Sequence, residues 1–242
     1  MKRLIVAVDD IAVMRYLMKD SDIDPVQVAV LAETAGAAGI TALLADSERG
    51  VQERDAALIK KLSKTFVNLH IPADPRLVKQ ALNIKPDMVT FVEVGRGEPP
   101  LMLPVSASGL EDVLGPYLAD FHANGISVGV FAEPEIGVLK ALSRVQVDYV
   151  EFDARGYTEA ADSNDELVGL DRLSSAALGA VKLGLGVNCY GGIDFEHLPS
   201  LAQVPRLEDI GMGMSLAKRA LLVGVDRAVR EARELILFHH RA

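Results

Sequence analysis

Hydrophobic positions along the chain fall into two alternating patterns. Short runs rich in valine and isoleucine are separated by longer stretches in which apolar residues recur every three or four positions. The short runs predict eight strands, at 3–8, 39–44, 66–71, 87–93, 126–131, 147–153, 185–189 and 207–212. The longer stretches predict helices at 24–37, 51–63, 74–82, 109–124, 133–145, 158–183 and 216–239. Regular alternation of strand and helix indicates a parallel sheet with helices packed against it.

The predicted helices carry their own boundary signals. Asp24 and Asp74 each precede a proline, so a capping carboxylate stands before a residue that suits the first helical turn. Gly36 and Gly125 end two helices shortly before the next strand. These signals support the strand and helix pattern independently of hydrophobicity.

The unit of one strand and one helix is about 30 residues long and recurs eight times with no linker between units. This favours an α/β fold, a (β/α)₈ TIM barrel with extra helices, and a single domain over residues 1–242. Three prolines between 95 and 108 exclude a regular helix there. We expect that segment to form a loop over the end of the barrel at which the strands finish, called the mouth below.

Composition and charge narrow the choice of partner. Of the 242 residues, 50% are hydrophobic and 24% charged, which suits a globular protein with a large core. A net charge of −9 counts against nucleic acid, because binding to a phosphate backbone needs a basic surface. The only cysteine, Cys189, excludes an intrachain disulfide, and no stretch has the length and apolarity of a membrane span or a secretion signal. We expect a cytoplasmic protein that binds a small molecule.

Polar residues at the strand ends carry the functional information, since ligands of such barrels bind at the mouth. Side chains alternate along a strand, so those on the inward face can be read from the sequence. We expect these polar side chains at or inside the mouth: Asp9, Asn68, His70, Glu151, Asp153 and Asn188.

Charged groups inside a barrel are costly unless they are paired, hydrated or bound to a ligand. One interpretation is a structural network in which these residues pair with one another or with Arg15 or Arg155. A second interpretation is catalysis, with His70, Glu151 and Asp9 as acid/base residues. A divalent metal is a third use of such groups, but their spacing forms no motif, and we assign no metal and no other cofactor.

Two glycine-rich turns follow the last two strands and lead into helices. Gly191 and Gly192 follow the seventh strand, and Gly211 and Gly213 lie at the end of the eighth. Backbone amides at such turns bind phosphate in many barrels of this type. We expect a phosphate site on these four residues, although glycine pairs are also ordinary in turns.

Several segments resemble the pyridoxine 5'-phosphate synthase family of vitamin B6 biosynthesis, over nearly the whole chain. They are Asp9 with Ile11, Ala12 and Arg15, the runs 24–27, 35–41, 68–69, 85–86 and 183–188, Glu151 with Gly156 and Tyr157, and Arg219 with Ala220. The resemblance implies a TIM barrel with extra helices that assembles as an octamer. It also implies a transferase that condenses 1-deoxyxylulose 5-phosphate with 3-amino-2-oxopropyl phosphate, releasing water and phosphate.

The chain departs from the family pattern at the positions that carry its chemistry. The resemblance implies histidines at positions that are Leu43, Gly191 and Met214 here, and a glutamate where this chain has His70. Leu43 and Met214 are therefore expected to shape a pocket rather than to move protons. The family's cationic groups after the second strand are also absent, being replaced by Ala45 and Gly50.

Three hypotheses for the function remain open. The first is a synthase-like enzyme that has diverged to another reaction, of condensation or lyase type, on a phosphorylated small molecule. The second is a non-catalytic ligand-binding or scaffold homologue, and the third is a genuine pyridoxine 5'-phosphate synthase. Whether the chain is an enzyme is thus undecided by the sequence. Homo-oligomeric assembly, as an octamer, is implied by the resemblance alone.

Overall fold

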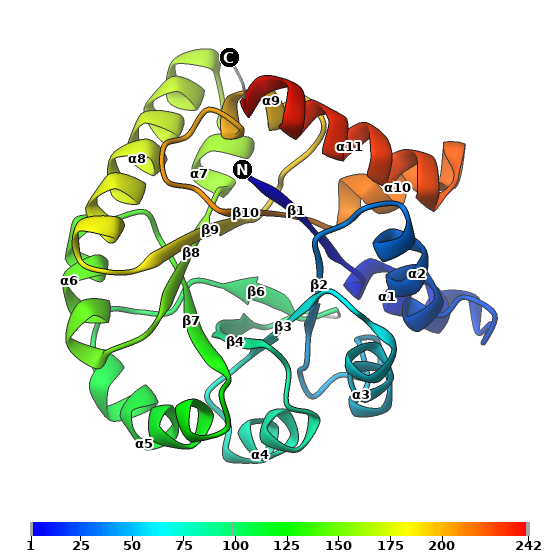
Figure 1. The fold of residues 1–242 in the computed structure, drawn as a ribbon, viewed down its shortest axis with the longest axis horizontal. Coiled ribbons are helices and arrows are strands. Elements are labelled where there is room, and N and C mark those ends of the chain that lie inside the picture. Colours follow the sequence, from blue (N-terminus) through cyan, green and yellow to red (C-terminus); the bar gives the residue numbers. More distant parts are fainter. Residues whose placement is uncertain (1, 98, 241–242) are drawn as a thin grey trace.

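The fold is a closed barrel of eight parallel strands surrounded by helices (Figure 1). The computed structural model describes residues 2–97 and 99–240. Neighbouring strands follow the order β1-β10-β9-β8-β7-β4-β3-β2 around the barrel. The strands are β1 (Arg3–Ala7), β2 (Gly39–Leu43), β3 (Phe66–Ile71), β4 (Met88–Phe91), β7 (Ser127–Ala132), β8 (Tyr149–Asp153), β9 (Gly186–Tyr190) and β10 (Asp209–Met212). The predicted TIM barrel is confirmed, and each barrel strand overlaps one of the eight predicted runs.

The helices differ from the prediction in four places. They are α1 (Asp9–Met18), α2 (Pro25–Thr34), α3 (Glu53–Leu62), α4 (Pro75–Ile84), α5 (Leu110–Ala123), α6 (Ile136–Val145), α7 (Arg155–Thr158), α8 (Ser163–Lys182), α9 (Leu198–Leu201), α10 (Met214–Val223) and α11 (Val225–His240). The prediction missed α1 and α9. It also started the helix of α8 five residues early, at the last residue of α7, and joined α10 to α11, although Gly224, at a φ of +84°, turns the chain between the last two.

The capping signals act as the sequence predicts. The carboxylate of Asp24 accepts a hydrogen bond of 2.9 Å from the N–H of Val26 in the first turn of α2. Asp74 accepts bonds from the first-turn amides of Arg76 and Leu77 in α4. Each carboxylate thus satisfies backbone donors that a helix start otherwise leaves unpaired.

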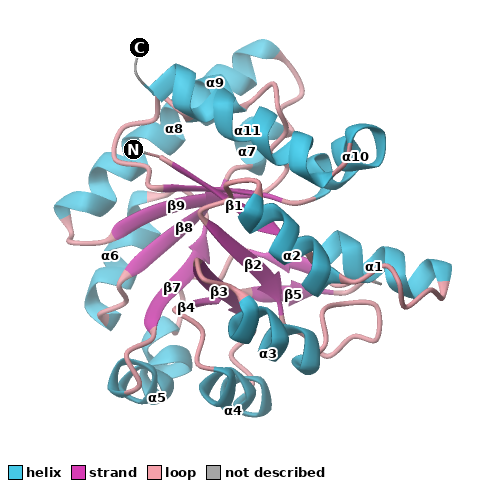
Figure 2. Cartoon of the chain, turned by 45° about the vertical axis from the view of Figure 1, so that its right-hand side comes forward, coloured by secondary structure: helices cyan, strands magenta, loops and turns pink. Residues whose placement is uncertain are grey.

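The barrel has an apolar outer layer and a polar interior. Val67, Leu69 and Ile71 of β3 are buried between the strands and the helices, as the alternation predicts. The helix α11 packs against α2, α9 and β1 and covers one side of the barrel (Figure 2). Inside the barrel, the strands bury several polar side chains, namely Thr41, Asn68, His70, Thr90, Glu151 and Asn188. None of the helices of the described residues is long and apolar enough to cross a membrane.

The segment predicted as a loop over the mouth contains a short antiparallel hairpin, β5 (Glu93–Gly95) and β6 (Leu101–Leu103). The guanidinium of Arg155, just beyond β8, donates to the carbonyl of Met102 at 3.0 Å. The N–H of Val105 donates to the carbonyl of Phe131 in β7 at 2.8 Å. These bonds hold the hairpin over the ends of β7 and β8, so it partly covers the mouth.

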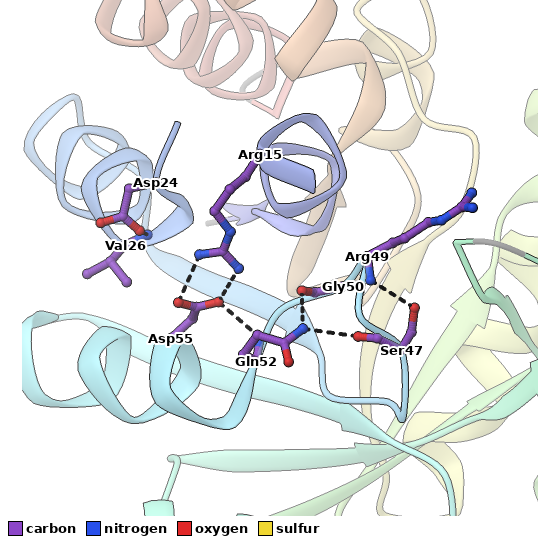
Figure 3. Close-up of polar contacts among 8 residues, drawn as sticks. All are labelled: Arg15, Asp24, Val26, Ser47, Arg49, Gly50, Gln52 and Asp55. Atoms are coloured by element: carbon purple, nitrogen blue, oxygen red, sulfur yellow. Dashed lines mark hydrogen bonds and ion pairs between the residues drawn. The ribbon is translucent and has the colours of Figure 1, made fainter. Parts of the chain in front are cut away.

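Polar contacts beside the mouth tie α1 to α3 and fix the loop after β2 (Figure 3). Both terminal nitrogens of Arg15 donate to the carboxylate of Asp55, at 3.0 and 2.6 Å. The side chain of Gln52 donates to the carbonyls of Ser47 and Gly50. Arg15 is thus paired with α3 and does not neutralise the acidic groups of the mouth, contrary to one form of the predicted network.

Candidate active site

The centre of the barrel holds an imidazole and a carboxylate in direct contact. Nε2 of His70, on β3, lies 2.5 Å from Oε2 of Glu151, on β8. Nδ1 of His70 lies 3.2 Å from the hydroxyl of Thr41 on β2. Both residues are at least 95% buried. The alternation predicted both side chains to point inward, and the closure of the barrel brings them together.

The contacts of His70 define what it can do chemically. Burial alone would lower the pKa of His70, but the charges of Glu151 and Asp9 outweigh it and hold that pKa above its ordinary value. Each ring nitrogen already has a partner. In this structure, His70 therefore has no ring nitrogen without a partner.

Asp9 lies at the junction of β1 and α1, on the mouth side of the His70 imidazole. Its carboxylate accepts a hydrogen bond of 2.6 Å from the N–H of Leu43. Burial raises the pKa of Asp9 above its ordinary value, against the opposing effects of that N–H and of His70. Asp9, His70 and Glu151, the three predicted catalytic residues, therefore lie in one electrostatically coupled group.

Asp153 does not belong to this group. Its carboxylate is paired with the guanidinium of Arg155, the shortest distance being 2.5 Å. The side chain of Asp153 is 5% exposed and that of Arg155 is 21% exposed. Of the alternatives that the sequence leaves open, the structural network with Arg155 is the one in which Asp153 takes part.

The two predicted asparagines have different surroundings. Asn68 is buried and accepts a 3.0 Å hydrogen bond from the hydroxyl of Thr90 on the next strand. Asn188 stands beside Glu151 in the β8–β9 register and is 3% exposed. Its side-chain oxygen is buried without a hydrogen-bond partner among the described residues. Asn188 therefore leaves an acceptor unused next to the central pair.

The predicted phosphate turn after β9 is close to other side chains. Gly191 and Gly192 have φ values of +111° and +61°, which L residues with side chains rarely adopt. A Cβ atom at Gly191 would lie 2.6 Å from Oδ1 of Asp153, and one at Gly192 would overlap the hydroxyl of Thr158. Close packing alone is thus enough to require glycine at both positions.

The predicted phosphate turn at β10 is filled by an aromatic ring. A Cβ atom at Gly211 would lie 2.6 Å from Cδ2 of Tyr190. One at Gly213 would lie 3.1 Å from the Tyr190 hydroxyl and 3.1 Å from Oδ2 of Asp10. Sequence reasoning assigned no role to Tyr190 or Asp10. The alternation along β9 would have directed Tyr190 inward together with Asn188.

The remaining predicted pocket residues lie at the edge of this arrangement. Leu43 is partly buried at the end of β2, whereas Met214 is 52% exposed at the start of α10. Cavities of about 660 and 310 Å³ lie against α11 and beneath the β5–β6 hairpin, and none of the three predicted catalytic residues lines them. Within residues 2–97 and 99–240, no group of three or more His, Cys, Asp or Glu side chains could hold a metal ion.

Comparison with known proteins places these features in a family. The model of "Pyridoxal phosphate biosynthesis protein PdxJ" matches residues 4–237. The pyridoxine 5'-phosphate synthase of Synechococcus sp. is 36% identical over 229 residues, 95% of this chain and 96% of that protein. The enzyme of the same name from Geobacter metallireducens is 35% identical, covering 98% of this chain and all of that protein.

Solved structures of other barrels show the same fold at much lower identity. The 3-hexulose-6-phosphate synthase of Salmonella typhimurium has a TM-score of 0.66 at 12% identity and covers 98% of this chain and all of its own. This likeness supports the architecture and carries no assignment of substrate. The family match over nearly the whole chain carries the classification: the chain belongs to the pyridoxine 5'-phosphate synthase family.

Proposed function

We propose that this chain is an enzyme that binds a phosphorylated carbonyl compound at the mouth and acts on it by acid/base chemistry, in a reaction of condensation or lyase type. The observation that carries the proposal is the buried contact between His70 and Glu151. Barrel interiors of this type are usually filled by branched apolar side chains. Burying an ion pair costs several kcal/mol per ion in desolvation, and apolar side chains of similar volume often fill such a space at no loss of stability. A buried ion pair at the centre of the barrel therefore favours a catalytic role for these residues over a purely structural one.

Divergence from the family's own reaction is supported by residues that cannot ionise. Leu43, Gly191 and Met214 stand where the family resemblance implies histidines. Loss of one positioned acid or base typically costs about 10²- to 10⁴-fold in rate, so the loss of three would remove a mechanism that depends on them. A reaction at a single carbonyl compound needs fewer such groups.

The phosphate group is proposed to bind at the turn of Gly191 and Gly192. Both residues have positive φ, a conformation that occurs in the turns whose backbone amides bind anions. Arg155, whose guanidinium is paired with Asp153, also lies beside this turn, with Cγ 3.3 Å from the position of a Cβ at Gly191. The second turn, at Gly211 and Gly213, is less suitable because the ring of Tyr190 lies over Gly211.

A direct assay separates the three hypotheses. The purified chain is incubated with 1-deoxyxylulose 5-phosphate, with 3-amino-2-oxopropyl phosphate, and with both, and the products are followed by NMR. Turnover of one compound alone, lost in Glu151→Gln, is the expected result. Formation of pyridoxine 5'-phosphate from the pair, with rescue of a strain unable to make vitamin B6, would identify a genuine synthase instead. If no turnover is seen with any phosphorylated compound, the chain is a non-catalytic homologue, and a rise in melting temperature then distinguishes a ligand-binding homologue from a scaffold.

A further inference from the structure

A small cavity lies at the end of the barrel opposite the mouth. It has a volume of about 50 Å³ and lies between α11 and the segments where β1 and β2 begin. Lys2, Arg3 and Arg233 line it, together with apolar residues of β1 and α11 and the turn before β2. None of its lining side chains is acidic, so the cavity is surrounded by positive charge alone.

The ammonium group of Lys2 is buried without a counter-ion. Lys2 is only 6% exposed, yet it forms no hydrogen bond or ion pair with any residue that the structure describes. Burial lowers the pKa of Lys2, and no carboxylate is among the groups that act on it. Lysine is almost never fully buried unless it is paired. Lys2 is thus a buried cation whose charge the chain does not compensate.

Arg233, on α11, brings a second cation to the same cavity. Its side chain crosses the turn at Gly36, where a Cβ atom would lie 3.2 Å from Cδ and 3.4 Å from Nε of Arg233. Gly36 has a φ of +105°, so both the backbone and the arginine require glycine in this turn. Over residues 2–97 and 99–240, Arg233 has no ion-pair partner. Its guanidinium is therefore available to a ligand.

The third cation, Arg3, is already neutralised. Its guanidinium donates to both carboxylate oxygens of Asp209, at 2.5 and 2.9 Å. The charge of Glu208 also acts on Arg3. Both carboxylates are thus directed to Arg3, and the uncompensated positive charge of the cavity comes from Lys2 and Arg233.

We propose that this cavity is an anion site that holds a small divalent oxyanion, of the size of inorganic phosphate, between Lys2 and Arg233. One water occupies at least about 10 to 15 Å³ of such a cavity, so this one has room for about three to five water-sized groups. That space suits a free phosphate ion better than a sugar phosphate. Ammonium and guanidinium groups are common partners of phosphate oxygens.

The anion site is independent of the function proposed at the mouth. Ligands that react in these barrels bind where the strands end, whereas the opposite end contributes to stability. We therefore expect the bound ion to stabilise the folded chain by compensating Lys2, and to take no part in the reaction.

Titration with inorganic phosphate, followed by ¹H–¹⁵N NMR at constant ionic strength, tests this proposal. Leu4, Gly36 and Ala38 line the cavity, so their amide signals should shift and saturate as phosphate is added. Lys2→Met and Arg233→Met should each weaken the apparent affinity at least about tenfold, since each removes a charge-assisted hydrogen bond. The amide signals of Gly191 and Gly192 report separately on the phosphate turn proposed at the mouth.

Thermal unfolding gives a second readout. Without phosphate, Lys2→Met should melt no lower than the unmodified chain, because the substitution removes a buried cation that has no partner. With saturating phosphate, the unmodified chain should gain about 2 to 4 °C more than Lys2→Met. A loss of melting temperature in Lys2→Met that is the same with and without phosphate would give Lys2 a structural role and overturn the proposal.

Matched variants control for the loss of a positive charge. Lys79→Met in α4 and Arg172→Met in α8 alter exposed cations far from the cavity in sequence, and both should bind phosphate like the unmodified chain. The anion site is overturned if chloride moves the cavity signals as phosphate does, if they do not move at all, or if either cavity variant keeps its full affinity. Each of these results leaves the proposed function standing, because the signals at the mouth are scored separately.

Discussion

Replacement of Asp10 by asparagine should stabilise the folded chain at alkaline pH. Folding raises the pKa of this carboxyl from 3.8 to about 6, mainly because the group is buried and because Asp9 is nearby. The folded state therefore binds the proton more tightly than the unfolded state, so stability is lost as pH rises from 3.8 to about 6 and stays lost above. Two pKa units correspond to about 3 kcal/mol.

Two effects reduce this gain. Asp10 is only partly buried, and its negative charge lies in the first turn of α1, where the helix dipole favours it by up to about 1 kcal/mol. We expect Asp10→Asn to raise the free energy of unfolding by about 1 to 2 kcal/mol at pH 8, and by no more than about 0.5 kcal/mol at pH 4.

Urea denaturation at pH 8 and pH 4, with equal slopes for both proteins, measures this difference. Asp112→Asn removes an exposed carboxylate from the first turn of α5 and should change stability by less than about 0.5 kcal/mol at either pH. A gain of equal size at both pH values, or a loss at pH 8, would show that the ionised carboxyl of Asp10 carries no folding cost.

The remaining predictions concern an ion pair, a turn and a thiol. Arg155→Met leaves the buried carboxylate of Asp153 unpaired and should cost about 3 kcal/mol or more in urea denaturation, whereas a loss below 1 kcal/mol would mean that water replaces the guanidinium. Gly192→Ala should destabilise the chain more than Gly125→Ala, because both sites have positive φ but only the first lacks space for a Cβ; equal losses would contradict this. The thiol of Cys189 is buried with a raised pKa, so it should react with a thiol reagent only as fast as the chain unfolds, and rapid reaction of the native chain would refute its burial.

The sequence predicts a helix or strand well where its hydrophobic residues follow a regular spacing, and poorly where they do not. The strand at 66–71 is predicted to the residue, because alternate residues face the outer core and the interior. Helix α1 is missed because its apolar residues do not keep to one buried face, and Leu17 and Met18 are mostly exposed. The break between α7 and α8 is missed for a different reason. The N-cap of α8 is Asp162, and one polar capping residue does not interrupt the regular spacing of the apolar residues around it.

For the candidate site, the sequence likewise predicts the local features but not the contacts between distant residues. Alternation along β3 and β8 directs His70 and Glu151 inward, and this much is local. Their contact joins residues 81 positions apart and depends on the closure and diameter of the barrel, which the sequence pattern does not record. The sequence singled out the glycines at 211 and 213 for a phosphate, which stays a prediction; the structure shows that the ring and hydroxyl of Tyr190 also give them a packing reason that no glycine motif contains.

Burial costs distinguish the acidic groups of the mouth by how far their charges are compensated. Glu151 is buried against His70, and their contact offsets part of the desolvation cost of both groups. Asp10 has no such compensation: burial and its neighbour Asp9 both oppose its ionised form, and Lys218 offsets them only in part. A residue whose charged form opposes folding is readily replaced by a neutral one unless a function needs it, because stabilising substitutions are common and usually accepted where activity is unaffected. Asp10 is therefore the acidic group at the mouth whose ionised form the folded chain compensates least, and its replacement by a neutral residue is the most direct measure of that cost.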